Sequence, residues 1–218
     1  MMPNYRTLSN FSERANRISD RIINSYSGGQ VSICDIGCRK CSLFNLIHEK
    51  KKDGFQFFGV DLESENLLEC KKKNYQAVQL DLNTDPLPFE KAKFDFVVAS
   101  EIIEHLHHPY QILGEIHRTL KDNGEFIITV PNIAALGKRV KLLLGGDPHA
   151  VYLPEEKDFH IREFTKGSLE KLLSFHGFRM ESHEMLDLPA KNPVSKLIKK
   201  CFPSCKSHIL YVAKKHYE

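Results

Sequence analysis

The sequence predicts an α/β protein in which a mostly parallel, doubly wound sheet carries helices on both faces. Short apolar runs alternate with segments of helical periodicity up to residue 130, and this alternation is typical of βαβ units. The runs are apolar throughout, as expected of strands that are buried on both sides. Two further apolar runs, close together near the end of the chain, predict an antiparallel pair at one edge of the sheet.

Each element has a local sequence signal. Apolar positions at helical spacing predict an amphipathic helix over 11–26, which the glycines at 28 and 29 end. Pro109 opens another helix at the position where its missing N–H costs nothing, and Gly177 ends a later one. The expected strands are 31–36, 56–60, 77–80, 94–99, 125–130, 178–186 and 208–213, which makes a seven-stranded sheet.

The composition is that of a folded domain. The 218 residues are 41% hydrophobic and 27% charged, and the net charge of +3 is too small to indicate nucleic acid. Residues 1–30 are expected to form an N-terminal helical cap on one domain, 31–218. No apolar run reaches the roughly 20 residues that span a bilayer, and the N-terminus lacks the apolar core of a secretory signal. We therefore expect a cytoplasmic protein whose six cysteines are reduced.

Acidic residues stand at the ends of three of the first four expected strands. These are Asp35, Asp61 and Asp81, and the fourth strand ends at Ser100-Glu101. Open parallel sheets bind ligands at the carboxyl ends of their strands. A row of acids suits ribose hydroxyls and an amino group and repels phosphate, so it indicates an adenosine ligand without phosphates. The alternative is that aspartate simply favours the turn that follows a strand.

Several segments resemble class I methyltransferases. VSICDIGCRKC is similar to the family's first motif, roughly D-x-G-x-G-x-G, and FFGVDLESENL to its second-strand acidic motif. The segment from LDLNTDPLPFE to HHP resembles the small-molecule branch that includes ubiquinone-pathway O-methyltransferases, and HIREFTKGSLEKLLSFHGF matches a later segment of that branch. The resemblance runs from about residue 31 to residue 178. It implies a Rossmann-like sheet and the cofactor S-adenosylmethionine.

The resemblance also implies a role for each strand end. Asp35 and Gly37 would shape the turn under the methionine part of the cofactor, Asp61 would hold the ribose hydroxyls, and Ser100 would line the methionine end. The full set of implied cofactor contacts is Asp35, Gly37, Cys38, Arg39, Asp61, Leu62, Asp81, Leu82 and Ser100.

The first motif departs from the family pattern at two glycines. Arg39 and Cys41 stand there instead, although glycine lets the backbone approach the ligand closely. The two side chains could narrow the cofactor pocket, or Arg39 could contact the cofactor's carboxylate. The departure also leaves open a non-catalytic protein that keeps the methyltransferase fold.

Four residues are candidates for catalysis or for binding a divalent metal. Glu101, Glu104 and His105 stand at i, i+3 and i+4, so a helical turn would place them on one face. His160 lies in a matched segment that could fold back to them. Two carboxylates and two imidazoles could bind a metal, and the pattern resembles metal-assisted O-methyltransferases and enzymes that methylate the 3′-terminal ribose of RNA. The alternatives are His105 or His160 as a general base without metal, or a solvated glutamate beside an ordinary helix-end histidine.

Radical enzymes that use S-adenosylmethionine with an iron–sulfur cluster are an alternative class. Cys34, Cys38 and Cys41 have the C-x3-C-x2-C spacing of radical enzymes, which hold an iron–sulfur cluster. Cys34 lies inside an apolar strand, and Lys40 stands where that family prefers an aromatic residue. The strand-end acids have no role in that scheme, so we expect no cluster.

The leading hypothesis is methyl transfer, at oxygen, to a small-molecule or lipid-linked acceptor. An RNA ribose 2′-O-methyltransferase is the rival, but it needs a basic groove with stacking aromatics, and the chain has little net charge and no tryptophan. The basic segment 191–201 has apolar positions at helical spacing. Such a segment can make a peripheral contact with a membrane surface, cover the active site, or pack with its lysines in solvent.

Overall fold

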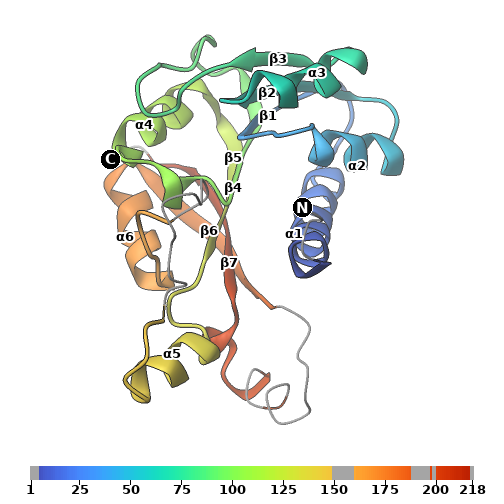
Figure 1. Ribbon diagram of the computed structural model, residues 1–218. Helices are drawn as coiled ribbons and strands as arrows, with labels where there is room; N and C mark the ends of the chain where they lie inside the picture. The colour runs from blue at the N-terminus through green and yellow to red at the C-terminus, as the bar shows by residue number, and fades with distance from the viewer. Residues whose placement is uncertain (1–4, 149–159, 188–196, 198–199, 217–218) are drawn as a thin grey trace.

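The computed structural model describes residues 5–148, 160–187, 197 and 200–216, with side chains from residue 13 onward. A single seven-stranded sheet forms its centre, in the order β3-β2-β1-β4-β5-β7-β6 (Figure 1). The strands are β1 (Val31–Ile36), β2 (Phe55–Asp61), β3 (Gln76–Gln79), β4 (Phe94–Ser100), β5 (Leu120–Pro131), β6 (Phe178–Leu186) and β7 (His208–Lys215).

Helices cover both faces of the sheet, as Figure 1 shows. On one face, α1 (Tyr5–Asn24), α2 (Ser42–Lys50) and α3 (Ser64–Lys72) share a hydrophobic core that includes Ile18, Phe44 and Leu67. On the other face, α4 (Pro109–Thr119) and α6 (Lys166–Phe175) share a second core. A further helix, α5 (Leu136–Leu143), lies at one end of the molecule and buries none of its residues. The turns η1 (Ile103–His105) and η2 (Pro203–Cys205) complete the described elements.

The predicted fold class is confirmed. Strands β1 to β5 pair in parallel, whereas β7 runs antiparallel to both of its neighbours, β5 and β6. Pro109 occupies the start of α4 as expected. The Thr165 side chain accepts a hydrogen bond from the Ser168 N–H to begin α6, and Gly177, at φ 73°, follows that helix.

Two predictions from the sequence concern the ends of the chain. The helix α1 packs Ile18 and Ile22 into the same core as α2, while its division from the rest as a separate cap stays a prediction. Most of 191–201 lies outside the described residues. Within the described part of the chain, no helix combines the length and the apolar character needed to cross a membrane.

Candidate functional site

The carboxyl edge of the sheet gathers the predicted strand-end residues. The order β3-β2-β1-β4 puts Asp81, Asp61, Asp35 and Ser100 next to one another in that sequence. Each belongs to a parallel strand or to the residues directly after it, so all four lie at the same edge. This is the edge where doubly wound sheets bind ligands.

The turn after β1 is fixed to β2 by backbone groups. The N–H groups of Gly37 and Cys38 both donate to the Val60 carbonyl oxygen, at 2.7 and 3.0 Å, and the Arg39 N–H donates to Asp61 Oδ2 at 2.7 Å. Gly37 has a φ of 74°, and a Cβ atom there would overlap the Ile102 side chain. Glycine is therefore required at this position by both the backbone conformation and the space available.

Arg39 and Cys41 keep the backbone that glycine would adopt. Their φ angles are 48° and 52°, in the left-handed region, where a residue with a Cβ atom is strained by roughly 1–2 kcal/mol. The departure from the family motif therefore changes the side chains and leaves the course of the turn intact. Strained backbone of this kind clusters at functional sites.

Asp61 and Asp81, which are neighbours in the row, differ in their partners. Asp61 Oδ1 accepts hydrogen bonds from the Glu63 N–H and the Asn66 side-chain amide, both at 3.0 Å. Asp81 Oδ1 instead accepts from the N–H of Asn83 at 2.9 Å, which is the turn-forming role that strand-end aspartates often have. Leu62, directly after Asp61 in the sequence, is 57% exposed, and an exposed leucine beside an acid suits a flat aromatic base.

Asp35 is buried at the centre of the row. Burial and the neighbouring charge of Asp61 raise the pKa of Asp35 to about 8. A carboxyl group in this state gains a cationic partner readily, because the cation would restore its ionised form. Ser100, next along the edge, shares a 2.9 Å hydrogen bond with the hydroxyl of Thr129.

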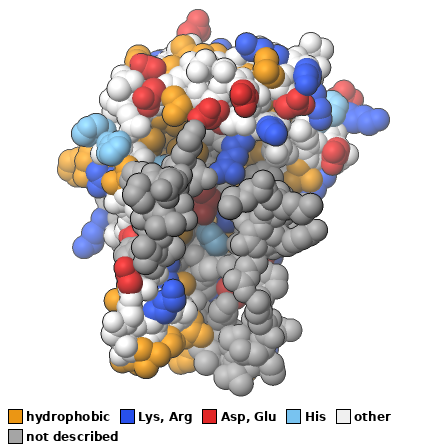
Figure 2. Space-filling view, viewed as in Figure 1, with side chains coloured by type: hydrophobic (Ala, Val, Ile, Leu, Met, Phe, Trp, Pro, Cys, Tyr) orange, Lys and Arg blue, Asp and Glu red, His pale blue; other side chains and the backbone are white. Residues whose placement is uncertain are grey.

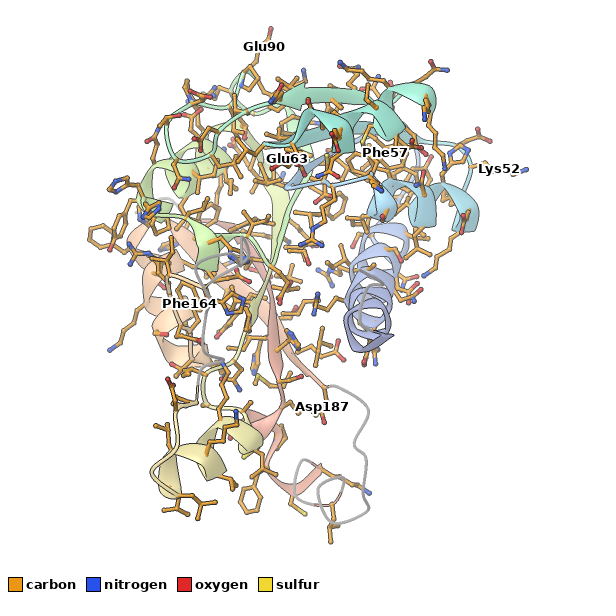
Figure 3. All side chains as sticks on the ribbon, in the orientation of Figure 1. Lys52, Phe57, Glu63, Glu90, Phe164 and Asp187 are labelled. Carbon is orange, nitrogen blue, oxygen red and sulfur yellow. A yellow bond between two sulfur atoms is a disulfide. The ribbon has the colours of Figure 1, made fainter. Side chains whose placement is uncertain are left out.

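A second group of polar side chains forms where the 160s meet η1. The ligand atoms of Glu104, His105 and His160 all lie within 4.8 Å of one another, and the two imidazole rings are 5.0 Å apart. The Glu104 carbonyl oxygen accepts the N–H groups of Ile161 and Arg162, which holds the distant segment in place. Further on, the segment runs beside β5 at Phe164, labelled in Figure 3.

Glu104 is fully buried, and its two carboxylate oxygens accept no hydrogen bond from any residue that the structure describes. Burial, with the nearby charge of Glu101, raises the pKa of Glu104 to about 9. A buried polar group without partners costs about 1–3 kcal/mol, and such groups persist at sites that receive a ligand or ion. Both histidines are partly exposed.

The expectation that Glu101 shares a helical face with Glu104 and His105 is wrong. Glu101 has a left-handed φ of 56° and precedes the 3-10 turn, so it lies outside the helical turn and outside the group of Glu104, His105 and His160. Glu101 Oε2 lies 3.7 Å from Arg14 Nη1 and 3.4 Å from His208 Nε2. Burial and the nearby positive charge of Arg14 lower the pKa of His208 to about 3.

Arg14 and His208 are site residues that sequence reasoning missed. Arg14 comes from α1 and His208 from the first position of β7, at opposite ends of the chain. No local motif links them, and only the antiparallel edge strand and the N-terminal helix bring them to Glu101.

The cysteines bear on two predictions, and the structure contradicts one of them. Cys34 belongs to one core layer, whereas Cys38 and Cys41 belong to the other, so the C-x3-C-x2-C spacing builds no three-thiol group. The expectation that all cysteines are reduced is wrong, because Cys41 forms a disulfide with Cys70. The pairing arises where the start of α2 meets α3, a contact that sequence spacing does not reveal.

Comparison with known proteins assigns the chain to a family. The chain belongs to the methyltransferase domain family, whose model matches residues 6–183. It is 32% identical over 99 residues to a probable S-adenosylmethionine-dependent methyltransferase of Mycolicibacterium smegmatis, a match that covers 45% of this chain and 34% of that protein. It is 28% identical over 118 residues to the carboxy-S-adenosyl-L-methionine synthase of Campylobacter lari, covering 52% and 50%. The chain thus spans a third to a half of the length of these curated relatives.

Solved structures share the fold at low sequence identity. A methyltransferase from Archaeoglobus fulgidus, described as dependent on S-adenosylmethionine, superposes with a TM-score of 0.63 at 18% identity, covering 97% of this chain and 100% of that one. The cyclase SpnF superposes equally well, with a TM-score of 0.63 at 14% identity, covering 93% and 82%. Since a cyclase has the same fold, the reaction must be inferred from the site.

Proposed function

We propose that this protein transfers a methyl group from S-adenosylmethionine to an acceptor oxygen. The observation that carries the proposal is the row of Asp81, Asp61, Asp35 and Ser100 along four adjacent strand ends. Carboxylates suit ribose hydroxyls and an ammonium group, and they repel phosphate. The names of both curated relatives contain this cofactor or its carboxy derivative, which supports the same reading.

The proposed cofactor contacts follow the order of the strands. Asp61 would accept the ribose hydroxyls while the adenine lies over Leu62, and Asp81 would meet the adenine edge. Asp35 would pair with the methionine ammonium group, because its raised pKa favours a cationic partner. Arg39, held at the turn by its own N–H, would reach the methionine carboxylate.

Calorimetric titration tests the cofactor half of the proposal. Wild-type protein should bind both S-adenosylmethionine and S-adenosylhomocysteine, and Asp61→Ala should weaken both by about tenfold or more, since a hydrogen bond to a charged group contributes about 1.5–3 kcal/mol. Asp53→Ala removes an exposed aspartate before β2 and should bind as wild type does. Absence of binding by the wild type would overturn the proposal.

Glu104, His105 and His160 are proposed to hold a divalent cation beside the transferred methyl. One carboxylate and two imidazoles are a donor set that transition metals accept. The buried Glu104 oxygens accept no hydrogen bond from the described part of the chain, which supports a cation as their partner. A bound ion would acidify a substrate hydroxyl and so improve it as the attacking group. The protein's own part is to fix the acceptor against the methyl group in line with the sulfonium.

A histidine base acting without metal is the second candidate. The partial exposure of His105 and His160 favours it, because an imidazole that receives the acceptor's proton must then release it to water. Activity that is lost on chelation and restored by Mn²⁺ would support the metal. Activity that survives exhaustive chelation but disappears in His105→Ala would support the base, with the exposed His107→Ala as the control.

The acceptor is proposed to be a small or lipid-linked molecule met at a membrane surface. Leu142 and Leu143 at the end of α5 and Leu144 directly after it are exposed at 55%, 85% and 79%. Figure 2 shows hydrophobic side chains gathered at that end of the molecule. Lysines stand among the apolar residues of α5, a composition that suits an anionic lipid surface.

A short chain of charged contacts connects α5 to the proposed acceptor site. Lys138 Nζ lies 3.0 Å from Glu163 Oε2, and Glu163 Oε1 lies 4.0 Å from His160 Nδ1. Cosedimentation with phosphatidylglycerol vesicles should fall when the three leucines 142–144 become serine. Products formed from a lipid extract would support the proposal, whereas methylated RNA as the sole product, or no product from any extract, would favour the rival functions.

A further inference from the structure

A covalent link joins the cofactor turn to helix α3. Cys41 directly precedes α2, and Cys70 lies in the second half of α3. Their Cα atoms are 5.6 Å apart, and the two residues are separated by 29 positions in the sequence. Both side chains are fully buried. None of the roles discussed above uses this bond.

The link acts on the residues that face the proposed cofactor. Cys70 Sγ lies 3.7 Å from the carbonyl oxygen of Arg39, and the Cys41 N–H donates to the carbonyl oxygen of Cys38 at 2.9 Å. On the other side of the turn, the Arg39 N–H donates to Asp61. The turn is therefore held to β2 by hydrogen bonds and to α3 by a covalent bond.

The disulfide restrains a strained backbone conformation in the turn. Arg39 and Cys41 both have left-handed backbone, a conformation that residues with a Cβ atom leave readily unless neighbouring structure holds them. In the matching family motif, glycine occupies these positions at no steric cost. The disulfide restrains one of the two strained residues directly and packs against the carbonyl group of the other.

The surroundings favour a disulfide over a metal bound by thiolates. Cys38 supplies a third sulfur within 4.8 Å of the other two, which by distance alone could complete a metal site. Burial and the charges of Asp35 and Asp61 raise the pKa of the Cys38 thiol. A thiol kept protonated is a poor metal ligand and a poor nucleophile toward a disulfide, so Cys38 neither completes a metal site nor attacks the bond.

We propose that the disulfide between Cys41 and Cys70 controls how tightly the cofactor turn holds its ligand. Oxidation removes two electrons and two protons from the two thiols; hydrogen peroxide accepts them and leaves as two waters. A dithiol reverses the step and is itself oxidised to a disulfide. The effect on ligand affinity rests on the proposed cofactor site, whereas the bond and its effect on the turn do not.

Peptide mapping and hydrogen exchange test the bond by itself. After treatment of the full chain with peroxide, digestion without reductant should yield a peptide pair linked through Cys41 and Cys70. Reduction should accelerate exchange of the amides at 37–43, and it should not do so in Cys70→Ala. A linked pair that includes Cys38, stoichiometric zinc released on thiol modification, or equal exchange in both redox forms would overturn the proposal.

Calorimetry with S-adenosylhomocysteine tests the effect on the ligand. Reduction should raise the dissociation constant about fivefold to tenfold, the size of ordinary coupling between two sites, in wild type and in the exposed-cysteine control Cys201→Ser. It should leave Cys41→Ala and Cys70→Ala unchanged. Equal affinity in the two redox forms of the wild type would contradict control by oxidation. If neither form binds while reduction still loosens 37–43, the proposed cofactor fails and the effect of the disulfide on the turn stands.

Discussion

The two halves of the site satisfy their polar groups in opposite ways. At the cofactor edge, Asp61 accepts hydrogen bonds from neighbours close to it in the sequence and from the turn beside it. At the proposed acceptor site, Glu104 is buried without a hydrogen-bond partner among the described residues, and its neighbours come from a segment more distant in the sequence. Asp61 thus has hydrogen-bond partners within the protein, whereas the carboxylate oxygens of Glu104 have none among the described residues and could accept a cation or a substrate group.

The largest expected effect is the loss of ligand binding at the proposed cofactor site when Gly37 is replaced. In Gly37→Ala the new methyl group meets Ile102 and the φ of 74° becomes strained, which together should cost about 2–4 kcal/mol. We expect a lower melting temperature and no measurable binding of S-adenosylhomocysteine. Gly114→Ala is the matched control, because its Cβ meets nothing within 4 Å in α4; it should gain about 0.5–1 kcal/mol. Normal ligand affinity in Gly37→Ala would contradict the geometry of the turn.

Glu104→Gln should separate stability from activity in the acceptor half. The pKa of Glu104, raised to about 9 from its ordinary 4.5, means that the folded protein holds an extra proton between these values. The contribution of Glu104 to stability is therefore full below about pH 4.5 and is lost as the pH rises through about 9, and the glutamine variant should lack this decline. Methyl transfer should fall about 10²–10⁴-fold.

Glu90→Gln is the control for that comparison, since Figure 3 shows Glu90 pointing away from the body of the molecule. Denaturant titrations at several pH values, paired with product assays, make both measurements. A glutamine variant that keeps full activity would remove Glu104 from the proposed reaction.

A smaller effect should appear in the pH dependence of cofactor binding. Asp35, with its pKa near 8 in the free protein, must ionise to pair with an ammonium group. Affinity for S-adenosylhomocysteine should therefore rise about tenfold per pH unit below 8 and level off above it. Calorimetry in buffers of different ionisation enthalpy should detect a released proton. Asp35→Asn should abolish both the slope and the proton release; an unchanged slope would assign it to another group.

The smallest expected effect is that of replacing Arg39, which stands where the family motif has glycine. Arg39→Gly should relieve left-handed strain and raise stability by about 1 kcal/mol, while it loses the proposed contact with the ligand carboxylate and weakens binding severalfold. Asn74→Gly, which relieves a φ of 59° away from the site, should gain stability with no change in binding. Tighter binding by Arg39→Gly would mean that the arginine narrows the pocket instead.

Local signals predicted the fold and the row of acids at one edge of the sheet. Apolar runs, Pro109 and the strand-end acids each report on a few neighbouring residues, and parallel pairing then brings the strand ends together without further information. The acceptor site is harder because its geometry depends on contacts across the chain. The spacing of Glu104 and His105 was informative, but the left-handed backbone of Glu101 and its contacts with Arg14 and His208 had no local signal. The disulfide partner of Cys41, Cys70, also could not be predicted from local sequence, because the pairing depends on how α2 and α3 pack.

Competition between S-adenosylhomocysteine and ATP tests the central claim most directly. If the acidic edge binds an adenosine ligand without phosphates, calorimetry on the full chain should give saturable binding of S-adenosylhomocysteine that excess ATP does not displace. The row of Asp35, Asp61 and Asp81 should repel the triphosphate. Binding of ATP in preference to S-adenosylhomocysteine would contradict the assignment of this edge. So would the absence of binding heat with both S-adenosylmethionine and S-adenosylhomocysteine.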